Sequence, residues 1–219
     1  MIFKDCIAKL QIAFNKPLPG YDAQQLLAPV HRKSTSFYLE RNPSYKTGCV
    51  MIILFPVNQE THLLMIERSD VGTHSGQISF PGGRREMDDA NLMDVALRET
   101  YEEVGVNPST IKFLGALTEL YIPVSNYLVH SFVGFIDQLP ELIINTTEVK
   151  KVLTPQLKIF LNHKGIATHD FSSYDGQVIN APYYAFQDYK IWGASAMIIS
   201  ELCILINSSS ENSDFVSSF

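Results

Sequence analysis

Three glutamates near the middle of the chain have the clearest potential for chemistry. Glu99, Glu102 and Glu103 are spaced i, i+3 and i+4, and at roughly 100° per residue such positions share one face of a helix. Like charges at this spacing destabilise an isolated helix by roughly a few tenths of a kcal/mol per pair. A bound cation would offset that repulsion, so we expect a cation site on this face.

The ligand type indicates which cation. Carboxylate oxygens are hard ligands that suit Mg2+ or Mn2+, and these ions keep several waters and bridge to substrate phosphates. Such a site would bring a phosphate-bearing small molecule to a chain of formal net charge -6, whereas that charge argues against broad binding to nucleic acid. The alternative is a solvated acidic helix face with Arg98 and Lys112 nearby, which is what a run of charge alone usually marks.

The segment before the glutamates contains groups that could meet a phosphate. Gly82 and Gly83 would let the backbone turn sharply and approach a phosphate closely, although a simple turn is compatible with the same residues. Arg68, Arg84 and Arg85 could each donate paired hydrogen bonds to phosphoryl oxygens. Taken singly, each arginine is more often an exposed, solubilising residue.

The glutamates are expected on a helix spanning residues 90–104. Apolar and small side chains recur there at helical spacing, and Gly105 is suited to end the helix. Upstream, apolar runs at 49–55 and 62–66 predict two strands joined by a turn. The other expected elements are helices at 2–14, 148–161 and 194–206, and strands at 111–122, 127–136 and 183–192.

Strands and helices that mix without strict alternation predict an α/β fold, with a mixed sheet covered by helices on both faces. A chain of 219 residues suits one main domain. We therefore expect an N-terminal helical extension at residues 1–30, the main domain at 31–206, and a serine-rich, disordered tail at 207–219.

Composition indicates a cytoplasmic protein. The chain is 46% apolar and 18% charged, and no apolar stretch is as long as a membrane-spanning helix. The first ten residues lack the continuous apolar run and cleavage site of a secretory signal. Three cysteines lie far apart and match no metal spacing, which suits a reducing compartment.

Residues 98–106 read Arg-Glu-Thr-Tyr-Glu-Glu-Val-Gly-Val and resemble the core of the Nudix box, Arg-Glu-x-x-Glu-Glu-x-Gly followed by an apolar residue. Residues 81–83, Pro-Gly-Gly, resemble its glycine-rich loop. The resemblance implies a Nudix-type α/β/α sandwich and metal-dependent hydrolysis of a diphosphate bond. It also implies that Glu99, Glu102 and Glu103 hold Mg2+ or Mn2+, with Arg98 orienting the carboxylates.

The box departs from the family pattern by one residue. Its first glutamate would fall on Ala90, with Asp89 one position earlier. Asp89 could be a further metal ligand, or an ordinary helix N-cap. This offset, together with residues 63–69 and 74–83, resembles the coenzyme A diphosphatase branch of the family. The basic residue that usually stands shortly before the histidine of that signature is replaced here by Gly72-Thr73.

The branch resemblance assigns further roles. The residues expected to meet the substrate are Arg68, His74, Gln77, Gly82, Gly83 and Arg84. The carboxylate that accepts a proton from water is either Glu103 or Glu148, which we expect in a later loop overhanging the site. The alternative for Glu148 is a residue at the start of a helix.

The implied reaction is cleavage of coenzyme A, or its thioesters, to 4'-phosphopantetheine and adenosine 3',5'-bisphosphate. One alternative is hydrolysis of another nucleoside diphosphate derivative, such as ADP-ribose, NADH or a dinucleotide. A second is a non-catalytic nucleotide-sensing module, although such a module would normally have lost part of the glutamate set. The expected partner is the small-molecule substrate, without nucleic acid or membrane, and a homodimer is one expected assembly.

Overall fold

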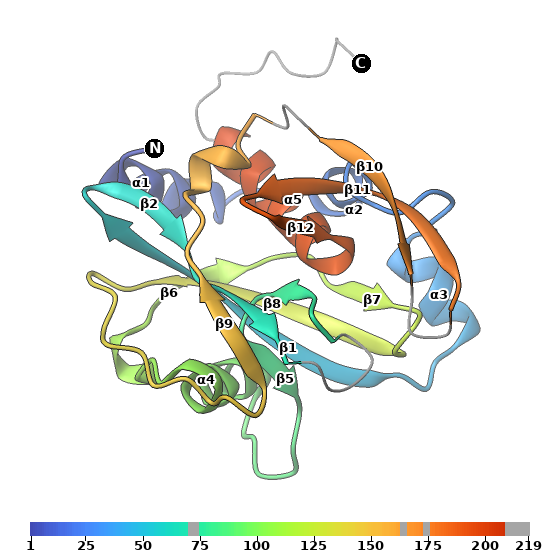
Figure 1. Cartoon of the computed structure of the whole chain (residues 1–219), viewed down its shortest axis with the longest axis horizontal. Coiled ribbons are helices and arrows are strands. Elements are labelled where there is room, and N and C mark those ends of the chain that lie inside the picture. The colour runs from blue at the N-terminus through green and yellow to red at the C-terminus, as the bar shows by residue number, and fades with distance from the viewer. Residues whose placement is uncertain (70–74, 163–165, 173–175, 209–219) are drawn as a thin grey trace.

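The structure is a computed structural model that describes residues 1–69, 75–162, 166–172 and 176–208 (Figure 1). Its helices are α1 (Phe3–Ala13), α2 (Gly20–Gln25), α3 (Thr35–Arg41), α4 (Leu92–Val104) and α5 (Gly193–Ser208), with short 3-10 helices η1 (Pro108–Thr110) and η2 (Leu157–Ile159). Its strands are β1 (Lys46–Val57), β2 (Glu60–Leu63), β3 (Met65–Arg68), β4 (Ile78–Ser79), β5 (Gly82–Arg84), β6 (Lys112–Ala116), β7 (Leu120–Ile122), β8 (Tyr127–Phe135), β9 (Val149–Leu153), β10 (Ala167–Ser172), β11 (Val178–Phe186) and β12 (Tyr189–Trp192).

A six-stranded mixed sheet forms the centre of the molecule. Its strands run in the order β2-β1-β8-β6, while β5 also pairs with β1 and β7 also pairs with β8. Strands β1 and β8 are parallel, and the other pairings of this sheet are antiparallel. The long β1 is therefore the strand to which the hairpin partner β2 and the glycine strand β5 are both attached.

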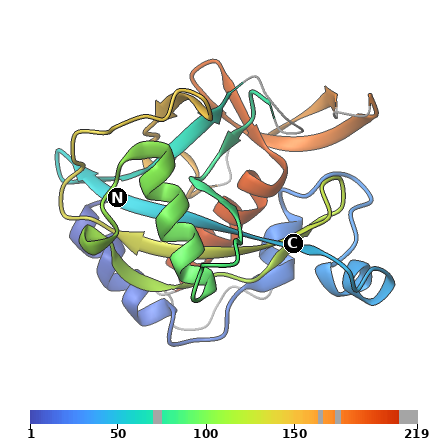
Figure 2. The ribbon, with the colours of Figure 1, turned by 90° about the horizontal axis from the view of Figure 1, so that it is seen from below.

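Helices cover both faces of this sheet, as Figures 1 and 2 show. Because side chains alternate along a strand, β1 contributes to two cores. Ile52 and Leu54 pack in the core formed with α1 and α5, whereas Met51, Ile53 and Phe55 pack in the core under α4. The expected α/β/α sandwich with a mixed sheet is confirmed.

The two smaller sheets account for two of the differences from the expected elements. Leu64 interrupts the strand expected at 62–66, so that β2 joins the central sheet and β3 joins β4 and β9. The strand expected at 183–192 is a hairpin, in which β11 and β12 are joined through Gln187 at φ 52° and packed beside β10. The strand expected at 111–122 is likewise divided, into β6 and β7.

The prediction of a helix at residues 148–161 is wrong. Residues Val149–Leu153 form β9, which pairs with β3, and only the short η2 follows. Valines at 149 and 152 favour an extended chain, and Pro155 lacks the N–H that an interior helical position needs. Helices α2 and α3 and strand β10 were not expected from the sequence.

The N-terminal segment packs against α5. Cys6, Leu10 and Ala13 of α1 share a core with α5. The buried Glu201 carboxylate accepts hydrogen bonds from Gly20 N at 3.2 Å, Gln24 Nε2 at 2.9 Å and Thr118 N at 3.1 Å. The predicted extension at 1–30 thus contacts the main body along its length, and its separate status stays a prediction. Most of the predicted tail, 209–219, lies outside the described residues.

Helix α4 ends at a glycine whose replacement should be measurable. Gly105 has φ 74°, and a Cβ there would lie 2.8 Å from Ile143 Cβ and 2.9 Å from Ile143 N. We predict that Gly105→Ala destabilises the protein by about 1 kcal/mol for the left-handed backbone, with about 1–3 kcal/mol more for the overlap. Thermal or urea unfolding would measure the loss.

The matched control is Gly176→Ala. Gly176 has φ 80°, and a Cβ there would meet no atom of the described residues within 4 Å. This variant should therefore lose the backbone contribution alone. Equal losses in the two variants would contradict the assigned role of the contact between Gly105 and Ile143.

Candidate active site

Helix α4 is fixed at both ends by side-chain and backbone caps. The Asn91 side chain accepts hydrogen bonds from Met93 N at 2.9 Å and Asp94 N at 3.0 Å, and Gly105 N donates to Tyr101 O at 2.9 Å. The N-cap is therefore Asn91, and the interpretation of Asp89 as the cap is wrong. Because β5 and β1 pair antiparallel and α4 packs on both, the helix lies across the glycine strand.

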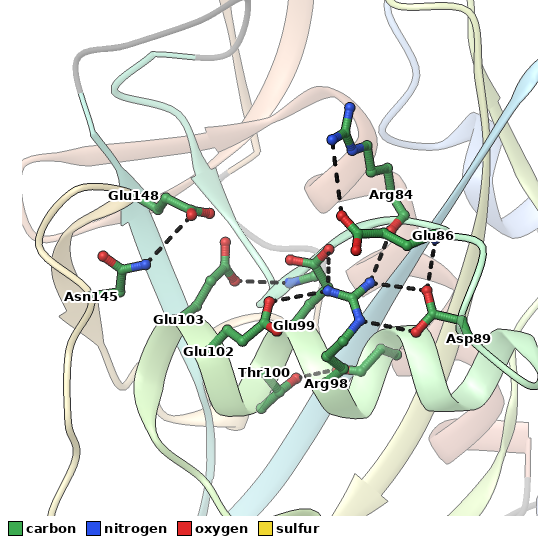
Figure 3. Close-up of polar contacts among 12 residues, drawn as sticks. Arg84, Glu86, Asp89, Arg98, Glu99, Thr100, Glu102, Glu103, Asn145 and Glu148 are labelled. Carbon is green, nitrogen blue, oxygen red and sulfur yellow. Dashed lines mark hydrogen bonds and ion pairs between the residues drawn. The ribbon is translucent and has the colours of Figure 1, made fainter.

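The three glutamates rise from the same side of α4, as Figure 3 shows. They differ in depth: the side chains of Glu103, Glu99 and Glu102 are 1%, 12% and 52% exposed. The buried end of this acidic face lies against β5, and the exposed end lies beside Arg98. Charge buried to this degree requires polar partners.

The glycines of β5 make the close packing of these carboxylates possible. Gly82 N donates to Glu103 Oε2 at 2.9 Å. A Cβ on Gly83 would lie 2.3 Å from the Glu99 carboxylate carbon, and a Cβ on Gly82 would lie 2.2 Å from Cys49 O. The backbone freedom that we expected to serve a phosphate therefore also serves Glu99 and Glu103, since no side chain fits at either glycine.

Arg98 connects the carboxylates and the preceding loop. Its Nε and Nη2 donate to Asp89 Oδ1 and Oδ2 at 2.9 and 3.0 Å. Its Nη1 lies 3.1 Å from Glu99 Oε1 and 3.0 Å from Glu102 Oε2. These partners, Asp89 first, raise the pKa of Arg98, and the Arg98 hydrogen bond lowers the pKa of Asp89. Asp89 therefore holds the loop to Arg98, and its role as a metal ligand stays a prediction.

Burial raises the pKa of the two inner glutamates, Glu99 and Glu103, which is the direction expected of a catalytic base. Desolvation raises the pKa of Glu103 to about 7, although the Gly82 N–H and the Arg68 guanidinium, with Nη1 3.8 Å from Glu103 Oε1, act in the opposite direction. Desolvation also raises the pKa of Glu99, in spite of Arg98. A carboxylate that titrates near neutral pH can both take up and release a proton there.

The donor set fits a hard divalent cation. Among the residues that the structure describes, each of the three glutamates keeps one carboxylate oxygen without a hydrogen bond from a described residue: Glu99 Oε2, Glu102 Oε1 and Glu103 Oε1. In the same part of the chain no group of three or more His, Cys, Asp or Glu side chains is already arranged as a cation site. Mg2+ needs few direct protein ligands because it keeps several of its waters.

A cavity of about 220 Å³ opens beside the buried end of the acidic face. Arg68 and Gly82 line it, and both contact the Glu103 carboxylate. Gln77, another expected substrate residue, also lines it. Arg32 and Trp192, two residues far from the motif, also line the cavity. The Trp192 ring is stacked on Phe171 at 4.0 Å.

The remaining expected residues lie in different surroundings. Glu148 is in the turn before β9, where its carbonyl accepts from Ser69 N at 2.8 Å, so the helix-start interpretation is wrong. Its carboxylate accepts from Asn145 Nδ2 at 3.4 Å and extends beside Glu103 in Figure 3. Arg84 is exposed and lies 3.9 Å from Glu86, and Arg85 is exposed too. His74 lies outside the described residues.

Sequence reasoning missed Arg32 and the C-terminal part of the cavity wall. Arg32 follows a Pro/Gly-containing segment without periodicity, and Trp192 stands in an ordinary aromatic strand. Neither carries a motif that could have marked it. Only the chain topology brings residues 29–32 and 192–198 next to the glycine loop.

The chain is similar to known proteins in sequence and in fold. Residues 47–165 match the model of the NUDIX domain. The chain is 26% identical to nudix hydrolase 3 of Caenorhabditis elegans, with 78% of this chain and 77% of that protein aligned. It is 33% identical to the uncharacterized Nudix hydrolase NudL of Photorhabdus laumondii, over 68% of this chain and 81% of that protein. A crystal structure of a MutT/nudix family protein from Enterococcus faecalis shares the fold, with a TM-score of 0.50, 18% identity and coverage of 78% and 69%.

The raised pKa of Glu103 predicts a pH-dependent stability in EDTA. The pKa of Glu103 is about 7 in the folded protein against an ordinary value of 4.5, so the proton stabilises the fold fully below pH 4.5. That contribution is lost as the pH rises through about 7, for a total of about 3 kcal/mol. Glu103→Gln keeps the shape and an acceptor for Gly82 N–H without titrating.

Urea unfolding of both proteins between pH 4 and 8 would measure the difference. We expect Glu103→Gln to gain stability relative to the wild type across this range. Glu141→Gln, at an exposed position, is the control and should follow the wild-type curve. Parallel curves for wild type and Glu103→Gln would show that Glu103 is not held protonated by burial.

Proposed function

Because this chain belongs to the Nudix hydrolase family, we propose that it is a metal-dependent hydrolase that cleaves the diphosphate bond of coenzyme A or its thioesters. The products would be 4'-phosphopantetheine and adenosine 3',5'-bisphosphate. Residues 63–69 and 74–83 support this substrate, since they resemble the coenzyme A diphosphatase branch.

The strongest structural support is the placement of Glu103. This buried carboxylate contacts both Gly82 N and Arg68, and these two residues line the cavity. A diphosphate that enters the cavity would therefore meet a guanidinium beside the acidic face. Arg68 can donate to phosphoryl oxygens with planar, directed N–H groups, which would hold the bond to be cleaved next to the carboxylates.

Glu99, Glu102 and Glu103 would hold Mg2+ or Mn2+ through their remaining oxygens. The cation would supply charge that polarises the diphosphate and lowers the pKa of a water. Glu103 is one candidate for the carboxylate that accepts the proton of this water, and Glu148 is the second candidate for this step. Arg98 would keep Glu99 and Glu102 oriented, and it is the positioning residue of the site.

Two alternatives lead to different measurements. The altered signature, with Gly72-Thr73 in place of a basic residue, keeps ADP-ribose, NADH and dinucleotides open as substrates. A nucleotide-sensing module without catalysis is the second alternative, against which the complete glutamate set argues.

A cytoplasmic location and a homodimer are further proposals. Cys6, Cys49 and Cys203 are buried free thiols, which fits a reducing compartment. In the described part of the chain, no helix has both the length and the apolar character needed to cross a bilayer. Cell fractionation and light scattering would test the two proposals.

A substrate panel tests the proposed activity. Purified protein with Mg2+ or Mn2+ would be incubated with coenzyme A, an acyl thioester, ADP-ribose and NADH, and products identified by mass spectrometry. We predict the highest kcat/KM for coenzyme A or its thioester, with the two expected products. A higher kcat/KM for ADP-ribose or NADH would contradict the assignment of coenzyme A as the substrate. Absence of any hydrolysis would favour the sensing module.

Replacing Glu102 tests the acidic face at its exposed end. Glu102→Gln removes one charge and keeps the shape, so we predict that kcat/KM falls by about 100-fold or more. The loss of stability should be only about 0.5 kcal/mol, because an exposed i,i+4 pair with Arg98 contributes little. The control Glu141→Gln makes the same charge change at an exposed residue that is not part of the acidic face, and unchanged turnover in Glu102→Gln would remove Glu102 from the metal ligands.

A further inference from the structure

We propose that Arg32 binds a second anionic group of the substrate, a phosphomonoester separate from the diphosphate that is cleaved. The inference rests on the proposed function and narrows it to nucleotides that carry such a group. Arg32 stands outside residues 47–165, the span that matches the family model. It would therefore determine specificity from a part of the chain that the motif does not include.

Arg32 and Arg68 line one cavity from different elements. Arg68 belongs to β3 and contacts Glu103 of α4. Arg32 follows α2 and donates from Nη2 to Tyr121 O of β7. Apolar side chains, among them Val50, Ile122 and Val129, also line the space. The cavity thus presents two guanidinium groups, and only Arg68 is bound to the acidic face.

The backbone around Arg32 is anchored on three sides. Val30 N donates to Asn180 O of β11 at 3.2 Å, and Arg32 N donates to Pro29 O at 3.1 Å. Gln25 Nε2 donates to Arg32 O at 3.2 Å. A guanidinium on a fixed backbone loses less entropy when it binds a ligand than one on a free surface chain. The segment is therefore suited to hold the side chain ready at the cavity wall.

Arg32 lacks a carboxylate partner in the described part of the chain. No Asp or Glu oxygen there lies within 4.0 Å of it, whereas Arg98 has three such partners. The Tyr38 ring has its centroid 6.0 Å from Arg32 Cζ. Burial lowers the pKa of Arg32, yet an arginine side chain stays charged in proteins. A partly buried cation without a counter-charge is stabilised by an anion from outside the chain.

A purely structural role explains only part of this arrangement. The bond to Tyr121 O would fasten the 29–32 segment to β7, and it uses one of the five N–H donors of the guanidinium. Among the described residues no other acceptor is bonded to the side chain. A phosphate dianion matches the remaining donors in charge and geometry. Coenzyme A carries such a group on its ribose, apart from the diphosphate.

The first experiment compares two substrates that differ in this one group. Wild type, Arg32→Gln and Arg32→Lys would be assayed with coenzyme A and with 3'-dephospho-coenzyme A. We expect Arg32→Gln to lose about 10- to 100-fold in kcat/KM for coenzyme A, mainly through KM, and less than about 2-fold for the dephospho form. Arg32→Lys should retain part of the preference. Equal effects on both substrates, or none, would overturn the proposal.

The second experiment does not depend on turnover. Calorimetry with Mg2+ present would compare adenosine 3',5'-bisphosphate with AMP. The wild type should bind the bisphosphate at least about 10-fold more tightly, and Arg32→Gln should bind the two equally. A wild type without preference, or a variant that keeps it, would reject Arg32 even if coenzyme A is hydrolysed. If coenzyme A is not hydrolysed, the proposed function fails, and this binding comparison still decides the role of Arg32.

The controls separate charge and folding from the specific contact. Arg41→Gln removes the same charge from an exposed arginine on α3 and should keep the wild-type preference in both experiments. Thermal unfolding would show whether Arg32→Gln is folded, since it loses the bond to Tyr121 O. If Arg32→Gln is not folded, Arg32→Lys takes its place in both experiments. A full wild-type preference in Arg32→Lys would show that the paired N–H donors of arginine are not what recognises the phosphate.

Discussion

The site depends on carboxylates held out of water against two glycines of β5, which have no side chains to obstruct them. Glu103 and Glu99 can lie where they do because Gly82 offers its N–H and Gly83 leaves the space that Glu99 fills. Burial opposes ionisation of both carboxylates, and a bound cation favours it. Without a ligand, burial therefore destabilises the ionised carboxylates. The cation that the site is proposed to bind would offset this destabilisation.

The packing of the sheet and helices holds these carboxylates in their buried positions. Strand β1 pairs with β5 through Cys49 and Val50 and fills both cores with alternate side chains. Helix α4 packs on the same two strands, so that its acidic face cannot turn away from the glycines without disrupting a core. Arg98 adds a second restraint by connecting Asp89 to Glu99 and Glu102. Catalytic geometry and fold stability therefore depend on the same contacts.

The sequence predicted those features whose causes are local. Helix α4, its end at Gly105 and the shared side of the glutamates follow from spacing along one element, and the structure has them. The predicted helix at 148–161 failed because pairing of β9 with β3, a contact distant in sequence, adds to the local preference of Val149 and Val152 for an extended chain. Arg32 escaped notice for the same reason: its setting depends on Tyr121 and Asn180, and no pattern near residue 32 encodes them.

The cavity wall is assembled from both ends of the chain, with Pro29 and Arg32 from one side of the sequence and Trp192 and Ile198 from the other. The acidic helix belongs to neither end. The proposed phosphate contact of Arg32 and the proposed cation site of α4 consequently lie in separate stretches of the chain, so that the flanking segments can change in sequence while the acidic face stays the same.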